Sequence, residues 1–152
     1  MKLDTQQIEI LGRNFLTSLF VAEDIEIAIP IRDKGLDLIA FKSISAQGRF
    51  RAIPVQMKAF SGRGFSVHRK YEKFPDLLMA YVWNVQNPLK TEAVVMTFKE
   101  AVGVAEILGW TQTTSWERAG YSVTNAGKRV LNELLPYRYE PGKLKKLMEI
   151  LD

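Results

Sequence analysis

The segments Gly35-Leu-Asp-Leu-Ile-Ala-Phe41 and Ile53-Pro-Val-Gln-Met-Lys-Ala59 decide the fold that we expect for this chain. Each has the apolar content and length of a β-strand. Between them, Ser43-Ile-Ser-Ala-Gln-Gly48 is rich in residues that favour turns. The pattern predicts an antiparallel hairpin over residues 36–59, with its turn near Ala46 and Gln47.

The predicted hairpin brings three polar side chains to one patch of sheet. In this register Asp37 lies opposite Gln56, and Lys58 shares the face of Gln56 because the two are two residues apart. A carboxylate, an amide and an ammonium group would then converge. The residues that alternate with them form the opposite, apolar face: Val55, Met57 and Ala59.

The same pattern also agrees with a purely structural role for these side chains. Asp37 can cap the turn at Gly35, while Gln56 and Lys58 can form the solvated face of an edge strand. Periodicity alone leaves both interpretations open.

An Asp, a hairpin and then Gln-x-Lys resemble the core motif of the PD-(D/E)XK nuclease superfamily. The resemblance implies an α/β fold with a restriction-endonuclease-like αβββαβ core, a mixed central sheet and C-terminal helices, formed as one nuclease-like domain over residues 1–152. It also implies a catalytic set of Asp37, Gln56 and Lys58, in which Asp37 and Gln56 hold Mg²⁺ or Mn²⁺ and Lys58 positions the attacking water. The implied function is metal-dependent hydrolysis of DNA, or DNA binding by a nuclease-like protein.

The first predicted helix bears on the metal site. An apolar stripe at helical spacing predicts a helix over residues 5–21, capped by Asp4 or Thr5. The resemblance implies a Glu after a small residue of this helix, but Gly12 is followed by Arg13. Glu9 lies one turn earlier on the same face and is either a substitute metal ligand or an ordinary surface residue.

The net charge of +4 is concentrated in one segment. Residues 49–73 hold seven Lys or Arg against Glu72 alone, whereas residues 1–48 carry a net charge of −2 and residues 74–152 are neutral. Such a block is typical of a polyanion-binding surface, and equally of a solvated loop. The resemblance favours DNA as the partner, with four candidate contacts: Arg63, Arg69, Lys70 and Lys73.

The rest of the chain alternates strand and helix signals. Apolar runs predict strands over residues 26–30, 65–70, 77–83 and 92–98. Helical signals cover residues 99–108, a segment capped by Thr124 or Asn125 that ends at Leu135, and residues 143–151. Residues 110–121 are expected to be irregular, and their aromatic side chains either anchor this loop on the core or stack on bases: Trp110, Trp116 and Tyr121.

Composition limits the other functions. The chain has no cysteine, which excludes disulfides and a cysteine nucleophile, and its single histidine, His68, excludes a multi-histidine zinc site. No apolar run reaches membrane-spanning length, so we expect a cytoplasmic protein without a membrane partner. Two other classes remain: an inactive nucleic-acid-binding module, and a protein-interaction domain or homodimer that uses the aromatic C-terminal third and the last helix.

Overall fold

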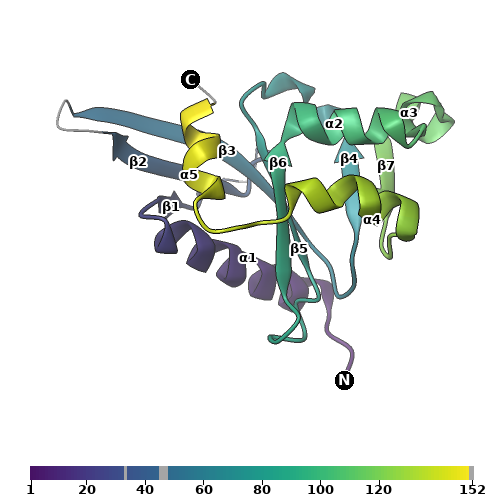
Figure 1. The fold of residues 1–152 in the computed structure, drawn as a ribbon, viewed down its shortest axis with the longest axis horizontal. Coiled ribbons are helices and arrows are strands. Elements are labelled where there is room, and N and C mark those ends of the chain that lie inside the picture. Colours follow the sequence, from purple (N-terminus) through teal and green to yellow (C-terminus); the bar gives the residue numbers. More distant parts are fainter. Residues whose placement is uncertain (33, 45–47, 151–152) are drawn as a thin grey trace.

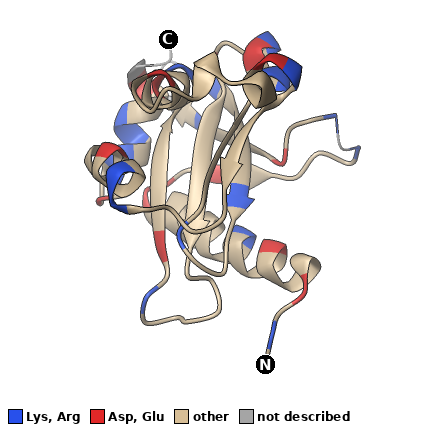
Figure 2. Ribbon diagram, turned by 90° about the vertical axis from the view of Figure 1, so that its right-hand side faces the viewer, with Lys and Arg blue, Asp and Glu red and all other residues tan. Residues whose placement is uncertain are grey.

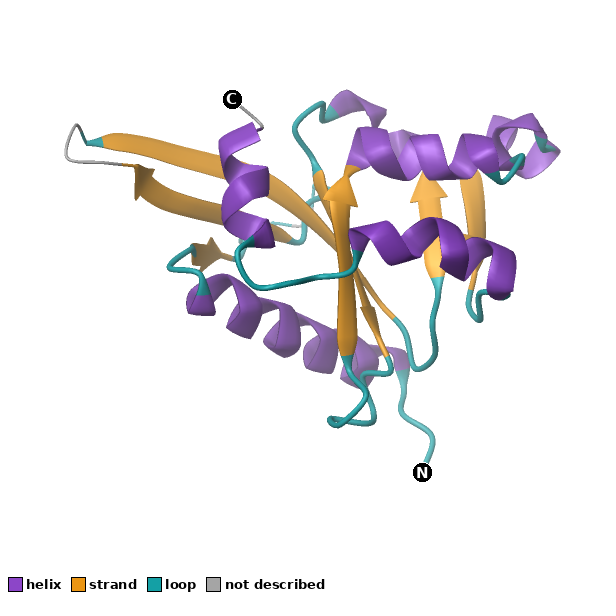
Figure 3. Ribbon diagram, viewed as in Figure 1, coloured by secondary structure: helices purple, strands orange, loops and turns teal. Residues whose placement is uncertain are grey.

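A mixed five-stranded sheet forms the centre of the structure (Figures 1 and 3). The computed structural model describes residues 1–32, 34–44 and 48–150, except for the side chains of Ile44 and Ile150. In chain order the elements are α1 (Thr5–Ala22), β1 (Glu26–Ala28), β2 (Leu38–Ile44), β3 (Arg49–Ala59), β4 (Phe65–His68), the 3-10 helix η1 (Arg69–Lys73), β5 (Leu78–Trp83), β6 (Glu92–Thr97), α2 (Phe98–Ile107), η2 (Trp110–Gln112), α3 (Thr114–Arg118), β7 (Gly120–Val123), α4 (Lys128–Leu134), η3 (Leu135–Tyr137) and α5 (Lys143–Ile150).

The sheet has the order β1-β2-β3-β5-β6. Strands β1 to β3 form an antiparallel meander, β5 is parallel to β3, and β6 is antiparallel to β5. This arrangement confirms the predicted α/β class with a mixed sheet. The hairpin register is also confirmed: Leu38 pairs with Val55, so Asp37 lies opposite Gln56. The predicted turn centre, Ala46 and Gln47, lies outside the described residues.

One face of the sheet is covered by the first and last helices. Leu16 and Phe20 of α1 share a buried cluster with Leu144 and Met148 of α5 and with the inward residues of β2, β3 and β5. Helix α1 begins where predicted, because the Asp4 side chain accepts a hydrogen bond from the Gln7 backbone at 2.8 Å and completes a capping box. The apolar stripe of α5 therefore docks on its own domain.

The other face is covered by the small β4–β7 sheet and by α2. Two buried polar side chains join β4 to the central sheet: Tyr81 donates from its hydroxyl to the Ser66 carbonyl, and Trp83 donates from Nε1 to the Gly64 carbonyl, each at 2.7 Å. Burial and the neighbouring Tyr71 raise the pKa of Tyr81 well above its ordinary value, so its hydroxyl remains a donor.

The connection between the parallel strands β3 and β5 contains β4 and η1. The resemblance places an α-helix in this crossover, and the segment between Ala59 and Leu78 does not form one. The connection still crosses the face opposite α1, because its residues Phe65, Val67 and Tyr71 pack in the second buried cluster.

The prediction that residues 110–121 are irregular was wrong. They form η2, α3 and the start of β7, which pairs with β4. Trp110 and Trp116 are buried and anchor this segment on the core. Because β7 is only four residues long and pairs with a distant strand, its structure depends on tertiary contacts that local patterns do not encode.

The predicted cap of the following helix was also wrong. Helix α4 begins at Lys128 after Gly127, not after Thr124 or Asn125. The Ala126 backbone donates to the Arg63 carbonyl at 2.7 Å, which holds this stretch against the loop before β4. Among the described helices, none has the length and apolar character that crossing a membrane requires.

Candidate functional site

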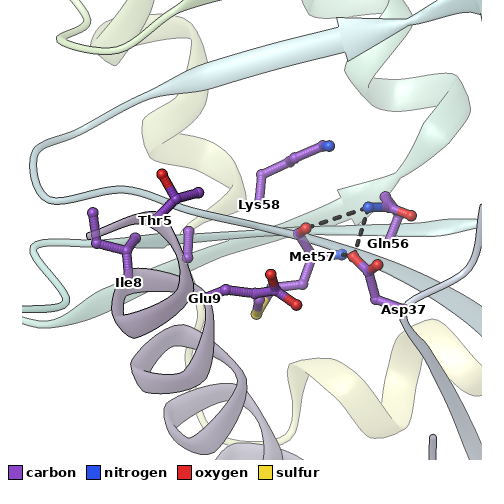
Figure 4. Close-up of a pocket in the computed structure, with 8 residues that line it drawn as sticks. Thr5, Ile8, Glu9, Asp37, Gln56, Met57 and Lys58 are labelled. Carbon is purple, nitrogen blue, oxygen red and sulfur yellow. Dashed lines mark hydrogen bonds between the residues drawn. The ribbon is translucent and has the colours of Figure 1, made fainter. Parts of the chain in front are cut away.

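The candidate site lies at the start of β2, where β3 continues beyond its pairing with β2. β2 begins at Leu38, and the Asp37 backbone donates the last rung to the Val55 carbonyl at 3.2 Å. Beyond this rung, residues 56–59 of β3 have β5 on one side and no β2 residue on the other. The Asp37 side chain takes the place of the missing strand: its Oδ2 accepts from the Met57 backbone at 3.0 Å and from Gln56 Nε2 at 2.6 Å (Figure 4).

The open edge of β3 and the first turns of α1 enclose a cavity of about 270 Å³. A close helix–strand approach shapes it, since a Cβ on Gly12 would lie 2.5 Å from the Cβ of Ala59. The cavity gathers the catalytic and metal-site residues named by the resemblance (Figure 4). Its lining consists of Thr5, Ile8, Glu9, Asp37, Gln56, Met57, Lys58 and Ala59.

In this arrangement the carboxylates of Asp37 and Glu9 already accept hydrogen bonds from other side chains of the protein. Gln56 turns its amide nitrogen, not its oxygen, toward Asp37, and the reverse orientation would set two oxygen acceptors 2.6 Å apart. The Oε1 of Gln56 is buried and has no hydrogen-bond partner among the described residues. Glu9 accepts from Arg13 Nη2 at 2.5 Å. The side-chain donors as they stand therefore do not fit a Mg²⁺ site, which requires convergent oxygens.

No larger acidic set compensates for this. Within residues 1–32, 34–44 and 48–150, the structure brings no three Asp, Glu or His side chains close enough to hold a metal ion. Gln56 and Arg13 therefore leave the site short of acidic ligands.

Beside the candidate site, Lys58 joins a basic region of the crossover. The Nζ atoms of Lys58 and Lys70 lie 5.9 and 5.0 Å from the centre of the Tyr71 ring. Burial, and then the charges of Lys58 and Lys70, hold the pKa of His68 below its ordinary value of 6.5. Burial is the larger cause of this lowered pKa, and the two lysines beside His68 add to it. The name basic surface is used below for Lys58, His68, Arg69, Lys70 and Lys73.

The structure extends the basic surface with a residue that the sequence did not indicate. A groove of about 400 Å³ lies between η1 and the end of α3, and Arg118 lines it opposite Lys70 and Arg69. The Arg69 backbone donates to the Ala119 carbonyl at 2.8 Å and fixes this contact. Two acidic side chains, Glu72 and Glu117, also line the groove. The β4–β7 pairing that creates this groove spans about fifty residues of sequence, so no local sequence pattern indicates that Arg118 lies there.

One of the four predicted nucleic-acid contacts lies apart from the others. Arg69, Lys70 and Lys73 all belong to η1, whereas Arg63 precedes β4 at its opposite end. Arg63 forms an ion pair with Glu92 at 3.1 Å, and Glu92 also pairs with Arg138 at 2.7 Å. Arg63 is therefore part of a surface ion-pair network.

Comparison of this chain with protein-family models, with curated proteins and with solved structures finds no match. Functional inference therefore depends on the residues of the chain itself.

Proposed function

We propose that this chain is a nuclease-like protein that binds nucleic acid, DNA above all, through the basic surface and does not cleave it. The observation that carries the proposal is a long stretch without acids. Residues 38–71 contain no Asp or Glu and seven Lys or Arg. Both charge signs are spread over the rest of the molecule (Figure 2), so this stretch gives the chain its local excess of positive charge.

The strand order supports a restriction-endonuclease-like assignment. A helix is followed by a three-stranded antiparallel meander and then by a strand parallel to the third, as the resemblance implies. The motif residues Asp37, Gln56 and Lys58 lie on the second and third strands or directly beside them. The 3-10 helix in the crossover is the main departure from the αβββαβ core.

Binding without cleavage follows from the role of Asp37. Its carboxylate oxygen already accepts two hydrogen bonds that close the edge of β3. Since this oxygen holds the Met57 N–H and the Gln56 amide, metal binding at Asp37 would have to use the other carboxylate oxygen or disturb these hydrogen bonds. Phosphate contacts of the basic surface require only Lys, Arg and backbone donors, although Arg69 already forms an exposed ion pair with Glu72 at 3.2 Å.

Metal-dependent cleavage with Mg²⁺ or Mn²⁺ is the second candidate function. It is favoured by one observation, the cavity that gathers Glu9, Asp37, Gln56 and Lys58. For this function the Gln56 amide would have to turn its oxygen toward the oxygens of Asp37, which breaks the hydrogen bond that it now donates to Asp37.

A salt titration of binding tests the first proposal. Fluorescence anisotropy with labelled single-stranded and duplex DNA would compare the wild type with Lys70→Ala and with the control Lys146→Ala, an exposed lysine of α5 on the opposite face of the sheet. We expect Lys70→Ala to lower the slope of log affinity against log salt by about 0.7 to 0.9, the value of one phosphate contact. Equal slopes for the two variants, or no binding at low salt, would overturn the proposal.

A cleavage assay separates the two candidates. Plasmid and single-stranded DNA would be incubated with Mg²⁺ or Mn²⁺ and the wild type, Asp37→Asn or Lys58→Ala. We expect intact DNA in every reaction. Metal-dependent cutting that both variants lose would establish the nuclease in place of the binding protein.

A further inference from the structure

The distal half of the β2–β3 hairpin carries an uncovered aromatic pair. This part of the hairpin extends past α1 and α5 and away from the body of the molecule (Figures 1 and 3). Ser43 pairs with Phe50 and Phe41 with Ala52, so the two phenylalanines are diagonal neighbours on one face. Their ring centres lie 5.5 Å apart with an angle of 36° between the planes.

These two rings do not serve the hydrophobic core. Neither Phe41 nor Phe50 belongs to either buried cluster, and 68% of the Phe50 surface is exposed. Ala52 between them is exposed as well. The strands therefore present the exposed Phe50 ring beside the partly buried Phe41 ring, and exposed apolar surface of this kind can mark an interaction site.

The charge around the rings is positive. The opposite face of the same ribbon carries Lys42 and Arg51, directly opposite each other, and Arg49 follows two residues away. The Arg51 guanidinium also donates to the Met148 carbonyl of α5, which orients this side chain at the ribbon.

Phe50 of the aromatic pair and Lys58 of the basic surface lie on the same strand. Phe50 and Lys58 project from the same face of β3, eight residues apart, which corresponds to roughly 26 Å at the rise of a strand. Lys58 in turn approaches Tyr71 of η1. A flexible polyanion that is longer than this separation can therefore contact both surfaces at once.

We infer that Phe41 and Phe50 form a base-stacking platform that selects single-stranded nucleic acid. This inference deepens the proposed function and rests on it. Unpaired bases expose the π-face that an aromatic side chain contacts, whereas the base faces of a duplex are covered by their neighbours. The surrounding lysines and arginines hold the phosphates, and the acid-free stretch imposes no repulsion.

Removal of one ring tests the platform. Phe50→Ala would be compared with Phe50→Trp, which keeps an aromatic face, and with Leu89→Ala, which truncates an apolar side chain that is 96% exposed in another loop. The probes are a labelled thymidine oligonucleotide of about twelve residues, an abasic oligonucleotide of the same length, and a blunt hairpin duplex. We expect Phe50→Ala to weaken binding of the thymidine strand about 5- to 100-fold, and Phe50→Trp and Leu89→Ala to bind it like the wild type. The abasic strand should bind the wild type as weakly as the thymidine strand binds Phe50→Ala.

The outcomes separate this inference from the proposed function. No binding of any probe by the wild type at low salt overturns both. Two results overturn the platform and leave the basic surface. One is equal affinity of Phe50→Ala and Leu89→Ala for the thymidine strand, and the other is equal affinity of the wild type for the thymidine and abasic strands. A dimer in sedimentation that only Phe50→Ala converts to a monomer, with unchanged DNA affinity, shows that the rings contact a second copy and also overturns the platform.

Discussion

The two ends of the β2–β3 hairpin reverse the usual distribution of polar and apolar residues. On a single face of β3, the polar Gln56 is 4% exposed and the apolar Phe50 is 68% exposed. Gln56 lies beside Met79 of the buried strand β5, under the crossover, whereas Phe50 lies where β3 has only β2 as a neighbour. Burial along this face is therefore set by what the crossover covers, and not by the composition of the strand.

This difference divides the hairpin into two parts. The base contains Asp37, Gln56 and Met57, and the arm is the distal half that carries Phe41 and Phe50. At the base, the Asp37 carboxylate accepts hydrogen bonds from the Met57 backbone and from the Gln56 amide nitrogen. On the arm, aromatic and basic side chains face solvent. Stability should therefore depend on the base, and recognition on the arm and the basic surface.

Within the hairpin, the largest effect should come from the carboxylate at the base. Asp37→Ala leaves the Met57 N–H and the Gln56 amide without their acceptor, and we expect a loss of about 2–4 kcal/mol in the free energy of unfolding. Asp37→Asn keeps an oxygen in the same place and should retain most of this stability. Urea denaturation measures both.

The pair of Asp37 variants also discriminates between a structural role and a metal-binding role of this carboxylate. A structural acceptor tolerates Asn, whereas a metal carboxylate does not. Equal destabilisation by Ala and Asn, together with stabilisation of the wild type by Mn²⁺, would contradict the structural role and remove the contrast between base and arm.

Gln56→Glu should have a smaller effect of the same kind. It places a second carboxylate at the position where the amide now donates to Asp37 at 2.6 Å, and we expect a loss of about 1–3 kcal/mol at pH 7 because two carboxylates repel each other. Thermal unfolding measures the loss, with Gln86→Glu in an exposed loop as the matched control.

The same variant restores the acidic pair that the resemblance implies. Mn²⁺ should therefore raise the midpoint of Gln56→Glu more than that of the wild type, since a bound ion relieves the repulsion. An equal response of the two proteins to Mn²⁺ would show that the neutral amide is not what limits metal binding.

The basic surface should give a modest dependence of stability on pH. Burial, Lys58 and Lys70 hold the pKa of His68 below 6.5, so the unfolded chain takes up its proton first as the pH falls. The contribution of neutral His68 is complete above pH 6.5 and is lost as the pH falls through the lowered pKa. His68→Gln does not titrate, so its melting temperature should decrease less than that of the wild type between pH 7.5 and pH 5.5. A larger decrease in the variant would contradict the positive environment.

Local patterns predicted the base of the hairpin well. The period of two places Asp37 opposite Gln56, and it separates Met57 from Lys58 on opposite faces, because alternation is a property of the strand itself. The helical stripes of α1 and α5 were predicted for the same reason, since each buries a face whose spacing is visible in the chain.

Features that depend on distant pairings could not be predicted. The β4–β7 pairing brings Arg118 to η1, and the Glu92 pair removes Arg63 from the basic surface; neither has a local signature. The hydrogen bonds of Asp37 could likewise not be predicted, because they depend on the residue at which β2 begins. Sequence reasoning therefore found the residues of the candidate site but not the contacts that engage them.

The smallest effect on stability should come from the ring at the end of the arm. Phe50→Ala removes a side chain outside both buried clusters, so we expect it to change the free energy of unfolding by less than about 1 kcal/mol. Phe65→Ala, in a ring that is fully buried against Tyr81 and Trp110, should cost about 3–5 kcal/mol. Urea denaturation of the two variants compares the same truncation on the arm and in the core. If Phe50→Ala destabilised the chain as much as Phe65→Ala does, the aromatic pair would be a structural element and the arm would lose its role in recognition.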